Sequence, residues 1–506
     1  MSPVPDARLC GSLADDLREA GFTASAVREA WGALADDAVG RGLRSPAERA
    51  LAGRADPLAV LALLLALGVA QPRSAVDAAL PRTGATGLAH LGLVALDGDA
   101  VVPAALVRPQ AYADSRDERA WWIASDLDEA ALRGPLPEDH VLGVGGASLT
   151  LAALVVPTPA ERALDLGAGC GIQSLRVRRD VDAVVATDVS ERALRFTRLN
   201  ALLNGVEHIE TRRGSLYEPV AGETFDRIVS NPPFVITPRL DAVPAYEYRD
   251  GGLEGDALVA SVISGAGRHL RPGGIAQLLG NWETRDGTPG LERAAQWVAA
   301  SDVAVDAWIV ERERLDPLAY AALWVRDGGT VAGTDEYERL ITAWLDDFAR
   351  RGVTEIGFGY VLLRRPESGS PTLSRYETVT TPVAEGVLGG HFAAALAAHD
   401  RLADLDDDAL SATVFVVAGD VTEARHHLPG SESPSVIELR QGAGFARVVE
   451  VDPALAGVVG ACDGDLPVGV LIDAVAELLD ADAAALRADL LPRIRELVMT
   501  GFLAFP

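Results

Sequence analysis

The sequence of 506 residues contains no lysine, so all 45 basic side chains are arginines. Its 73 acidic residues outnumber them, which gives a formal net charge of −28. Capture of nucleic acid by electrostatic attraction needs a basic face, so the overall charge weighs against it. A local arginine patch would still be compatible with this average.

Cysteine is also scarce, with only Cys10, Cys170 and Cys462, far apart in the sequence. They form no CxxC pair, so we expect no disulfide framework, and free thiols fit a reducing cytoplasm. The 8 histidines show no metal-ligand spacing. We therefore predict a cytoplasmic protein without a structural metal.

Long hydrophobic runs are missing as well. The most apolar run, residues 57–70, is shorter than the roughly 20 residues that a membrane span needs, so we predict a buried core helix there. The N-terminus lacks the basic and then apolar plan of a signal peptide. A composition of 49% hydrophobic and 23% charged residues is typical of globular proteins.

The chain divides into three predicted domains. Residues 1–130 combine short helical patterns with a hairpin at Asp97-Gly98, which indicates a helical, winged-helix-like accessory domain. No arginine lies in the expected third helix, residues 84–92, which favours docking or dimer contacts over DNA reading. Residues 367–506 are acidic and end in strands, helices and a closing "GFLAF", which again indicates a winged-helix-like accessory domain.

The middle domain, residues 135–366, alternates strand-like and amphipathic helical runs. This alternation predicts an α/β fold with a parallel sheet covered by helices on both faces. The last two strands, around "AWIVERE" and "GFGYVLLRR", are expected to pair antiparallel, with a helix between them in sequence. The Pro-, Gly- and Ser-rich residues 364–375 are predicted to be a linker.

A glycine-rich turn follows the first strand of the middle domain, in "ALDLGAGCGIQS". Gly167, Gly169 and Gly171 allow a close approach of the backbone to a ligand, but tight turns need glycine too. The next strand ends in Asp188, about 20 residues past this turn, where a carboxylate can bind a ribose diol. Alternatively, Asp188 caps the following helix, a role that Ser190 can equally fill.

The turn and Asp188 together resemble class I S-adenosylmethionine (SAM)-dependent methyltransferases, a family with a Rossmann-like, seven-stranded domain. The resemblance implies SAM as the cofactor. The implied cofactor residues are Asp165, Gly167, Ala168, Gly169 and Gly171 for the methionine part, Asp188 for the ribose, Val189 for the adenine, Ser215 and Leu216 where the family has an adenine-binding Asp, and Asn231 and Thr150 as further contacts. Thr150 lies in residues 143–156, which we expect to form a helix closing over the cofactor.

The segment "NPPF" follows the fourth strand and resembles the [N/D]PP[Y/F] signature of amino-group and amide methyltransferases. An amide nitrogen is a poor nucleophile because its lone pair is delocalised. The resemblance implies that the Asn231 oxygen and the Pro232 carbonyl accept its two N–H groups, and that Phe234 stacks on the planar group. Asn231, Pro232 and Phe234 are the predicted catalytic residues.

Two families share this plan and leave the acceptor open. The segments "GSLYEPVAGETFDRIVSNPPFVIT" and "RDGGLEGDALVASVISGAGRHLRPGG" are more similar to the PrmC/HemK type, which methylates a protein glutamine amide. Phe234 is commoner in the RsmC/RlmG type, which methylates guanine N2 in ribosomal RNA. The acidic charge favours a protein or peptide acceptor. A specialised peptide-tailoring enzyme and a SAM-binding scaffold remain alternatives.

Overall fold

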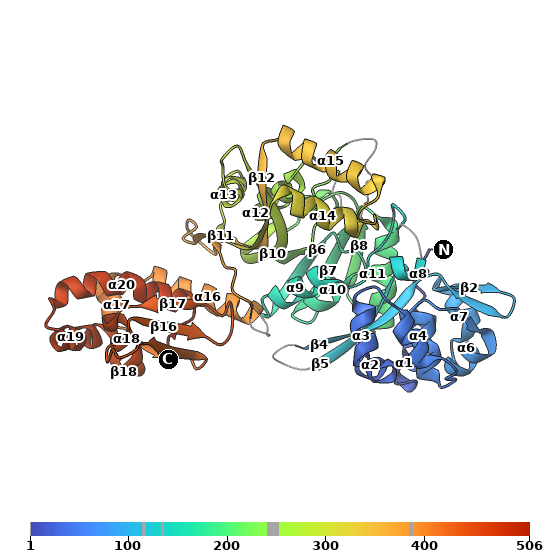
Figure 1. The fold of residues 1–506 in the computed structure, drawn as a ribbon, viewed down its shortest axis with the longest axis horizontal. Coiled ribbons are helices and arrows are strands. Elements are labelled where there is room, and N and C mark those ends of the chain that lie inside the picture. The colour runs from blue at the N-terminus through green and yellow to red at the C-terminus, as the bar shows by residue number, and fades with distance from the viewer. Residues whose placement is uncertain (1, 114–117, 133–135, 240–251, 384–387) are drawn as a thin grey trace. The chain divides into compact units, whose positions relative to one another are not determined.

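The computed structural model describes residues 2–113, 118–132, 136–239, 252–383 and 388–506 (Figure 1). By its internal contacts the chain divides into two compact units. The larger unit comprises residues 1–152 and 159–378, and the smaller one comprises residues 153–158 and 379–506. Among the described residues, every helix is too short or too polar to cross a membrane.

An eight-stranded sheet forms the core of the larger unit. Its strands are β6 (Ala160–Leu166), β7 (Val181–Asp188), β8 (Ile209–Arg213), β9 (Phe225–Ser230), β10 (Leu270–Arg285), β11 (Asp306–Leu315), β12 (Val353–Arg364) and β13 (Ser374–Thr378). The strand order is β13-β11-β12-β10-β9-β6-β7-β8. All pairs among strands β6 to β10 are parallel, whereas β12 is antiparallel to both β10 and β11. The predicted Rossmann-like α/β class with an antiparallel last pair is confirmed.

Residues 135–366 contribute seven strands to the sheet, as predicted, and the eighth comes from the segment expected to be a linker. Residues 374–378, which we expected in a linker, form β13 and pair in parallel with β11 from Ala307↔Ser374 to Glu311↔Thr378. The Trp308 indole N–H donates to the Glu377 carboxylate at 2.7 Å, which helps to fix this strand. A five-residue polar edge strand behind a Pro- and Ser-rich stretch has too little apolar periodicity to be recognised in the sequence.

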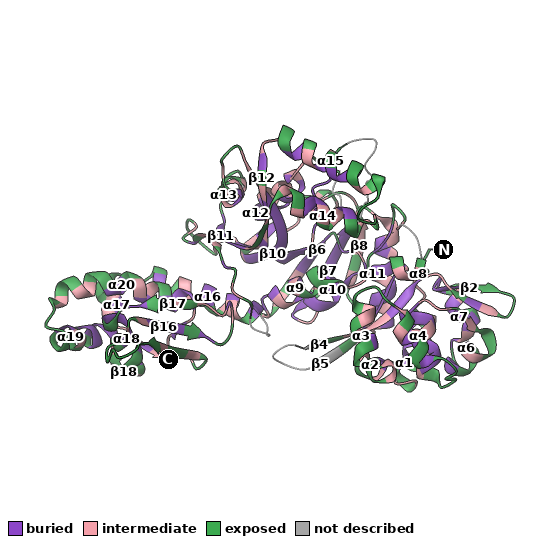
Figure 2. Ribbon diagram, viewed as in Figure 1, coloured by how far each residue is buried: buried purple, intermediate pink, exposed green. Residues whose placement is uncertain are grey.

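Helices pack on both faces of the sheet (Figure 1), and many of its strand residues are buried (Figure 2). The helices in this part of the chain are α9 (Gly146–Leu154), α10 (Ile172–Val177), α11 (Glu191–Leu203), the 3-10 turn η2 (Glu218–Val220), α12 (Ala257–His269), α13 (Gly290–Ala299), α14 (Pro317–Asp327) and α15 (Asp335–Arg350). Val259 and Ala294, from α12 and α13, pack with Leu164 and Leu278 on one face. Strand side chains alternate between faces, so Asp165 and Asn281 point to the opposite face.

The N-terminal part of the larger unit combines helices with two small sheets. Its elements are α1 (Ala7–Glu19), α2 (Ala24–Trp31), α3 (Ala33–Gly40), α4 (Ser45–Leu51), α5 (Pro57–Leu61), the π turn η1 (Ala62–Ala66), β1 (Gln71–Pro72), α6 (Arg73–Ala79), α7 (Gly84–His90), β2 (Val94–Asp97), β3 (Ala100–Pro103), β4 (Leu106–Ala113), β5 (Glu118–Ser125) and α8 (Glu129–Leu132). Strands β2 and β3 form the hairpin predicted at Asp97-Gly98, with β1 on the far side of β3. The helix predicted over residues 57–70 is buried, as expected.

Two asparagines at the C-terminal end of α11, Asn200 in the helix and Asn204 as its C-cap, attach this N-terminal part to the sheet. The Asn200 side chain accepts from the Ala124 N–H at 2.7 Å and donates to the Ala124 carbonyl at 2.9 Å. Asn204 makes the same pair of bonds with the Trp122 backbone, both at 2.9 Å. The edge of β5 is thereby hydrogen-bonded to α11, the helix that follows β7, so the first domain is fixed close to the carboxyl edge of the sheet.

The smaller unit contains helices and two three-stranded sheets. Its elements are α16 (Leu388–Ala403), α17 (Asp407–Ser411), β14 (Val414–Val417), β15 (Val421–His426), β16 (Val436–Gln441), β17 (Val448–Val451), α18 (Pro453–Gly460), β18 (Asp463–Pro467), α19 (Val468–Leu478), α20 (Ala483–Met499) and β19 (Leu503–Ala504). The sheets have the orders β18-β14-β19 and β15-β16-β17. Leu503 of the closing "GFLAF" segment pairs with Val417.

Candidate active site

The glycine-rich turn after β6 faces open space. Gly167 and Gly169 have φ values of +76° and +56°, and a Cβ atom added at either position would meet nothing within 4 Å. Gly171 differs, because its Cβ would lie 2.9 Å from a side-chain atom of Thr197 on α11. The first two glycines thus leave room beside the backbone, whereas the third permits close packing of α10 on α11.

Asp188, at the end of β7, is hydrogen-bonded to the glycine turn. Its carboxylate accepts from the Gly169 N–H and from the Ser190 N–H, each at 2.9 Å. Ser190 is the residue that caps α11, because its hydroxyl accepts from the Ala193 N–H. Next to it, Val189 is an apolar side chain with 49% of its surface exposed. Ala168 is buried, and its N–H donates to the Thr187 carbonyl at 3.0 Å.

Asp165 lies one residue before the end of β6 and is buried. One carboxylate oxygen accepts from the Ser174 hydroxyl at 2.6 Å. The other oxygen, Oδ1, is buried and lacks a hydrogen-bond partner among the described residues. Burial therefore raises the pKa of Asp165 to about 7, although the Ser174 hydroxyl opposes the rise.

The remaining predicted cofactor residues lie on two further segments. Ser215 and Leu216 follow β8, and Leu216 has a left-handed φ of +47°. The preceding residue, Gly214, donates its N–H to the Asp188 carbonyl at 3.0 Å, which brings this loop against the end of β7. Thr150 is half-buried on α9, the helix predicted over residues 143–156. The Gln173 amide of α10 donates to the Ser148 carbonyl of α9 at 2.7 Å.

The asparagine loop begins where β9 ends, directly beside the end of β6. The Ser230 hydroxyl donates to the Leu166 carbonyl at 2.8 Å and connects the two strand ends. Neighbouring parallel strands present their carboxyl ends at one edge, so the glycine turn and the asparagine loop lie side by side. The Asn231 Oδ1 atom is buried and has no hydrogen-bond partner in the described part of the chain. Pro232 is buried as well.

Phe234 is held by an aromatic cluster on α14 and β12. Its ring meets those of Trp324 and Phe358 edge-on, at centroid distances of 6.3 and 6.4 Å. Its backbone carbonyl accepts from the Asn281 amide of β10 at 2.7 Å. The Tyr320 hydroxyl accepts from Asn281 and from the Ile236 N–H, each at 3.0 Å.

Asn281, Tyr320 and Ser174 are absent from the residues that the sequence predicted. They bond to the backbone of the asparagine loop or to Asp165. Asn281 and Tyr320 lie outside the two motifs, whereas Ser174 ends the quoted glycine-rich stretch but was given no role. Asn281 did leave a signal, because "IAQLLGNWETR" places polar residues at alternate positions of an otherwise apolar strand. A buried polar row of that kind needs partners, so it marks a site rather than a plain core strand.

The segment that contains this edge of the sheet matches a known protein family. Residues 144–288 match the family model described as "Methyltransferase small domain". Residues 19–104 and 395–505 match two further models, each described as a domain of unknown function (DUF7059 and DUF7782). Residues 144–288 thus form a class I SAM-dependent methyltransferase domain, as the sequence motifs predicted.

Among the most similar curated proteins are two kinds of glutamine methyltransferase. The release factor glutamine methyltransferase of Xylella fastidiosa is 37% identical over 150 residues, which cover 28% of this chain and 54% of that protein. The ribosomal protein uL3 glutamine methyltransferase of Bradyrhizobium diazoefficiens is 30% identical over 194 residues, or 34% of this chain and 59% of that protein. The chain thus spans about half the length of the curated relatives it matches.

Among the solved structures with a similar fold is the 16S rRNA N2 G1207 methyltransferase RsmC of T. thermophilus in complex with AdoMet and guanosine. It is 18% identical and covers 53% of this chain and 67% of that chain, with a TM-score of 0.28. A likeness of this size supports no argument about substrate.

Proposed function

We propose that the chain is a SAM-dependent N-methyltransferase whose acceptor is the side-chain amide of a protein or peptide glutamine. The observation that carries the proposal is the Asn231 oxygen, which is buried without a partner at the carboxyl edge of the sheet. An unpaired buried acceptor costs about 1–3 kcal/mol, and an N–H group of a bound amide would remove that cost.

The residues around the glycine turn fit SAM. The open space beside Gly167 and Gly169 admits a ligand against the backbone, and Asp188 lies where a ribose would be held. The exposed Val189 offers an apolar surface to an adenine, while Asp165, Ala168, Gly171, Ser215, Leu216 and Thr150 complete the predicted set. SAM, when bound, supplies a methyl group attached to a positively charged sulfur.

The asparagine loop has the groups that an amide nitrogen needs. The Asn231 oxygen and the Pro232 carbonyl accept the two N–H groups, which orients the nitrogen lone pair toward the methyl group. These oxygens would stabilise the positive charge that develops on the nitrogen as it takes up the methyl group. The nitrogen then releases one proton to water. Phe234, fixed edge-on by Trp324 and Phe358, forms the wall beside the planar group.

The glutamine acceptor is supported by the two kinds of relative reported above, which both carry glutamine in their names. The net charge of −28 disfavours an extended phosphate backbone, which supports a protein over ribosomal RNA. The three cysteines are free and buried, in keeping with the proposed cytoplasmic location.

We also propose that both flanking regions are winged-helix-like. The expected limits were 1–130, 135–366 and 367–506, and β13 moves the last boundary to residues 378 and 379. From α5 to β3 the chain runs helix, strand, helix, helix and hairpin, with a sheet order of β1-β3-β2. In the smaller unit, α18, β18, α19, α20 and β19 repeat the order helix, strand, helix, helix, strand, with β14 as the central strand.

The proposal is tested by incubating the purified protein with methyl-labelled SAM and a cell extract separated into RNA and protein fractions. An Asn231→Ala variant serves as the control. We expect label in a protein band with the wild type and none with the variant. Label confined to ribosomal RNA would replace this proposal with guanine methylation, and the absence of any label would favour a peptide-tailoring enzyme or a SAM-binding scaffold.

A further inference from the structure

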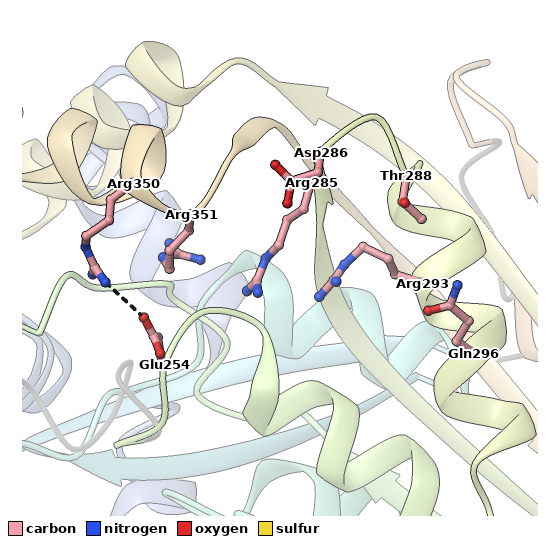
Figure 3. Close-up of a pocket in the computed structure, with 8 residues that line it drawn as sticks. All are labelled: Glu254, Arg285, Asp286, Thr288, Arg293, Gln296, Arg350 and Arg351. Carbon is pink, nitrogen blue, oxygen red and sulfur yellow. Dashed lines mark ion pairs between the residues drawn. The ribbon is translucent and has the colours of Figure 1, made fainter.

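A polar pocket of about 540 Å³ lies beyond the end of β10 in the larger unit. Four arginines line it, Arg285, Arg293, Arg350 and Arg351, together with two acidic residues, Glu254 and Asp286 (Figure 3). Three further carboxylates lie beneath the lining and pair with these arginines. The pocket as a whole therefore carries no excess of positive charge, and what it offers to a ligand is N–H donors.

Three buried carboxylates beneath the lining hold the guanidinium groups in place. Asp256 accepts from Arg293 at 2.7 Å and from Arg285 at 3.2 Å. Arg351 donates to Glu283 at 2.5 Å, and the third carboxylate, Asp347, also accepts from Arg351. Charge-assisted bonds of this kind fix the orientation of the arginines before any ligand arrives, which lowers the entropic cost of binding.

Two of these arginines keep N–H groups that the carboxylates do not use. Among the described residues, Nη1 of Arg285 has no hydrogen-bond partner, and neither has the buried Nε of Arg293. Figure 3 shows the two guanidinium groups side by side, as expected from their shared contact with Asp256. A carboxylate between them would accept from both and satisfy a buried donor.

One buried row of β10 gives the spacing between the pocket and the asparagine loop. Asn281, which holds the Phe234 carbonyl, is on the same face of the strand as Glu283 and Arg285, because strand side chains alternate. Four residues of strand separate Asn281 from Arg285, or about 13 Å. An extended peptide spans that distance in about four residues.

We propose that this pocket binds an aspartate or glutamate side chain of the acceptor protein, about four residues away from the glutamine that is methylated. The inference rests on the proposed function. It adds a determinant of substrate choice, since an acidic residue at this spacing would distinguish the modified glutamine from others. A carboxylate suits the paired guanidinium forks, whereas an RNA backbone would meet the repulsion of the whole chain.

The test uses synthetic glutamine peptides in which one glutamate is moved along the sequence, one position at a time. For the wild type we expect KM to be about tenfold lower when the glutamate is about four residues from the glutamine, with kcat unchanged, since the contact is equal in ground and transition states. Arg285→Gln should abolish this preference. Arg268→Gln removes the same charge from an exposed side chain of α12, away from the pocket, and should keep it.

Arg285 is part of a buried network, so Arg350→Gln at the exposed rim provides a second variant with less risk to folding. It should weaken the preference in part. A KM that is independent of glutamate position, or a preference that survives Arg285→Gln in a folded protein, would overturn the inference. It would also be overturned if Arg285→Gln reduced labelling of RNA but left peptide methylation unchanged.

If no peptide is methylated, the proposed function fails, and the pocket is then judged by binding alone. Intrinsic tryptophan fluorescence would measure the Kd of the same peptides, with and without the glutamate. A roughly tenfold preference of the wild type for the glutamate peptide that Arg285→Gln removes would support the pocket. Equal Kd values would overturn it.

Discussion

Two neighbouring strands of the sheet each end next to a buried oxygen that lacks a hydrogen-bond partner among the described residues. On β6 this is Oδ1 of Asp165, and after β9 it is Oδ1 of Asn231. A carboxylate can relieve the cost by taking up a proton, which is why the pKa of Asp165 rises to about 7. An amide does not titrate in this range, so only a donor from a ligand can satisfy Asn231.

This difference separates the two halves of the site. The cofactor half depends on pH, because its unpaired oxygen belongs to a titratable group. The acceptor half depends on the ligand, because its unpaired oxygen stays an acceptor at every ordinary pH. Most other atoms of both loops are bonded within the chain, by Ser174 and Asp188 on one side and by Asn281 and Tyr320 on the other.

The largest effect is expected for Asn231→Ala. Loss of the oxygen that orients the nitrogen should lower kcat/KM by about a thousandfold, by analogy with the removal of one donor from an oxyanion hole. The free energy of unfolding should change by less than about 1 kcal/mol, since the oxygen makes no bond in the folded chain. Steady-state methylation and thermal unfolding of the same preparation measure both quantities.

Asn204→Ala is the matched control, because that amide is fully engaged with the Trp122 backbone. It should cost about 1–3 kcal/mol of stability by leaving buried backbone groups unpaired, while kcat/KM of the folded protein is retained. The opposite pattern, with stability lost in the Asn231 variant and activity lost in the Asn204 variant, would contradict this account.

The next effect concerns Asp165. Its carboxyl ionises near pH 3.8 in the unfolded chain but only near 7 in the folded one, so the folded state binds the proton more tightly. Wild-type stability therefore contains a contribution that is present below about pH 4 and lost as the pH rises to about 7. Asp165→Asn should remove this loss, a difference of roughly 2–4 kcal/mol.

Urea unfolding of the wild type and of Asp165→Asn at a series of pH values would measure this pH-dependent difference in the free energy of unfolding. The stability of the variant relative to the wild type should increase between pH 4 and 7 and then level off. Ser174→Ala removes the hydroxyl that favours the charged form and should extend the increase to higher pH. A constant difference between wild type and Asp165→Asn would mean that the pKa of this carboxyl is the same in the folded and the unfolded chain.

Smaller effects are expected for Gly171→Ala and Gly169→Ala, the first on stability and the second on SAM affinity. Gly171→Ala places a methyl group against Thr197 and should cost about 1–3 kcal/mol of stability. Gly169→Ala meets no atom of the chain but intrudes on the open space, so we expect SAM affinity to fall by about tenfold. Calorimetric SAM titrations and melting curves would measure both. Equal loss of SAM affinity in the two folded variants would indicate that both glycines contact the cofactor.

The smallest effect is expected for Tyr217→Phe. The Tyr217 hydroxyl donates to the Val262 carbonyl of α12 at 2.9 Å, and its ring stacks on His269 at 4.5 Å. Removing the hydroxyl while keeping the ring should cost about 1 kcal/mol, with little change in SAM affinity. A clear loss of SAM affinity would place this tyrosine in the cofactor half of the site.

Much of this arrangement could be predicted from local sequence, because motifs at strand ends have a fixed place in a parallel sheet. The glycine turn, Asp188 and the asparagine loop were each located by a strand followed by polar or glycine residues. Their convergence followed from the common edge. The capping role of Ser190 was also within reach, since a serine before a helix is a usual cap.

Other features depend on contacts that are distant in sequence. β13 is held by pairing with β11, some 60 residues earlier, and its own five residues carry little pattern. The hydrogen bonds from Asn200 and Asn204 to the backbone of β5 join residues about 80 positions apart. The arginine pocket likewise draws Arg285, Arg293 and Arg351 together only through the buried carboxylates that they share.

The most direct test of the central claim is tandem mass spectrometry of the acceptor labelled by the wild-type protein. We predict one added methyl group on the side-chain nitrogen of a glutamine, and none after incubation with Asn231→Ala. A methyl group on guanine, on a carboxylate or on a backbone nitrogen, or an equal yield of methylglutamine from both proteins, would contradict the account.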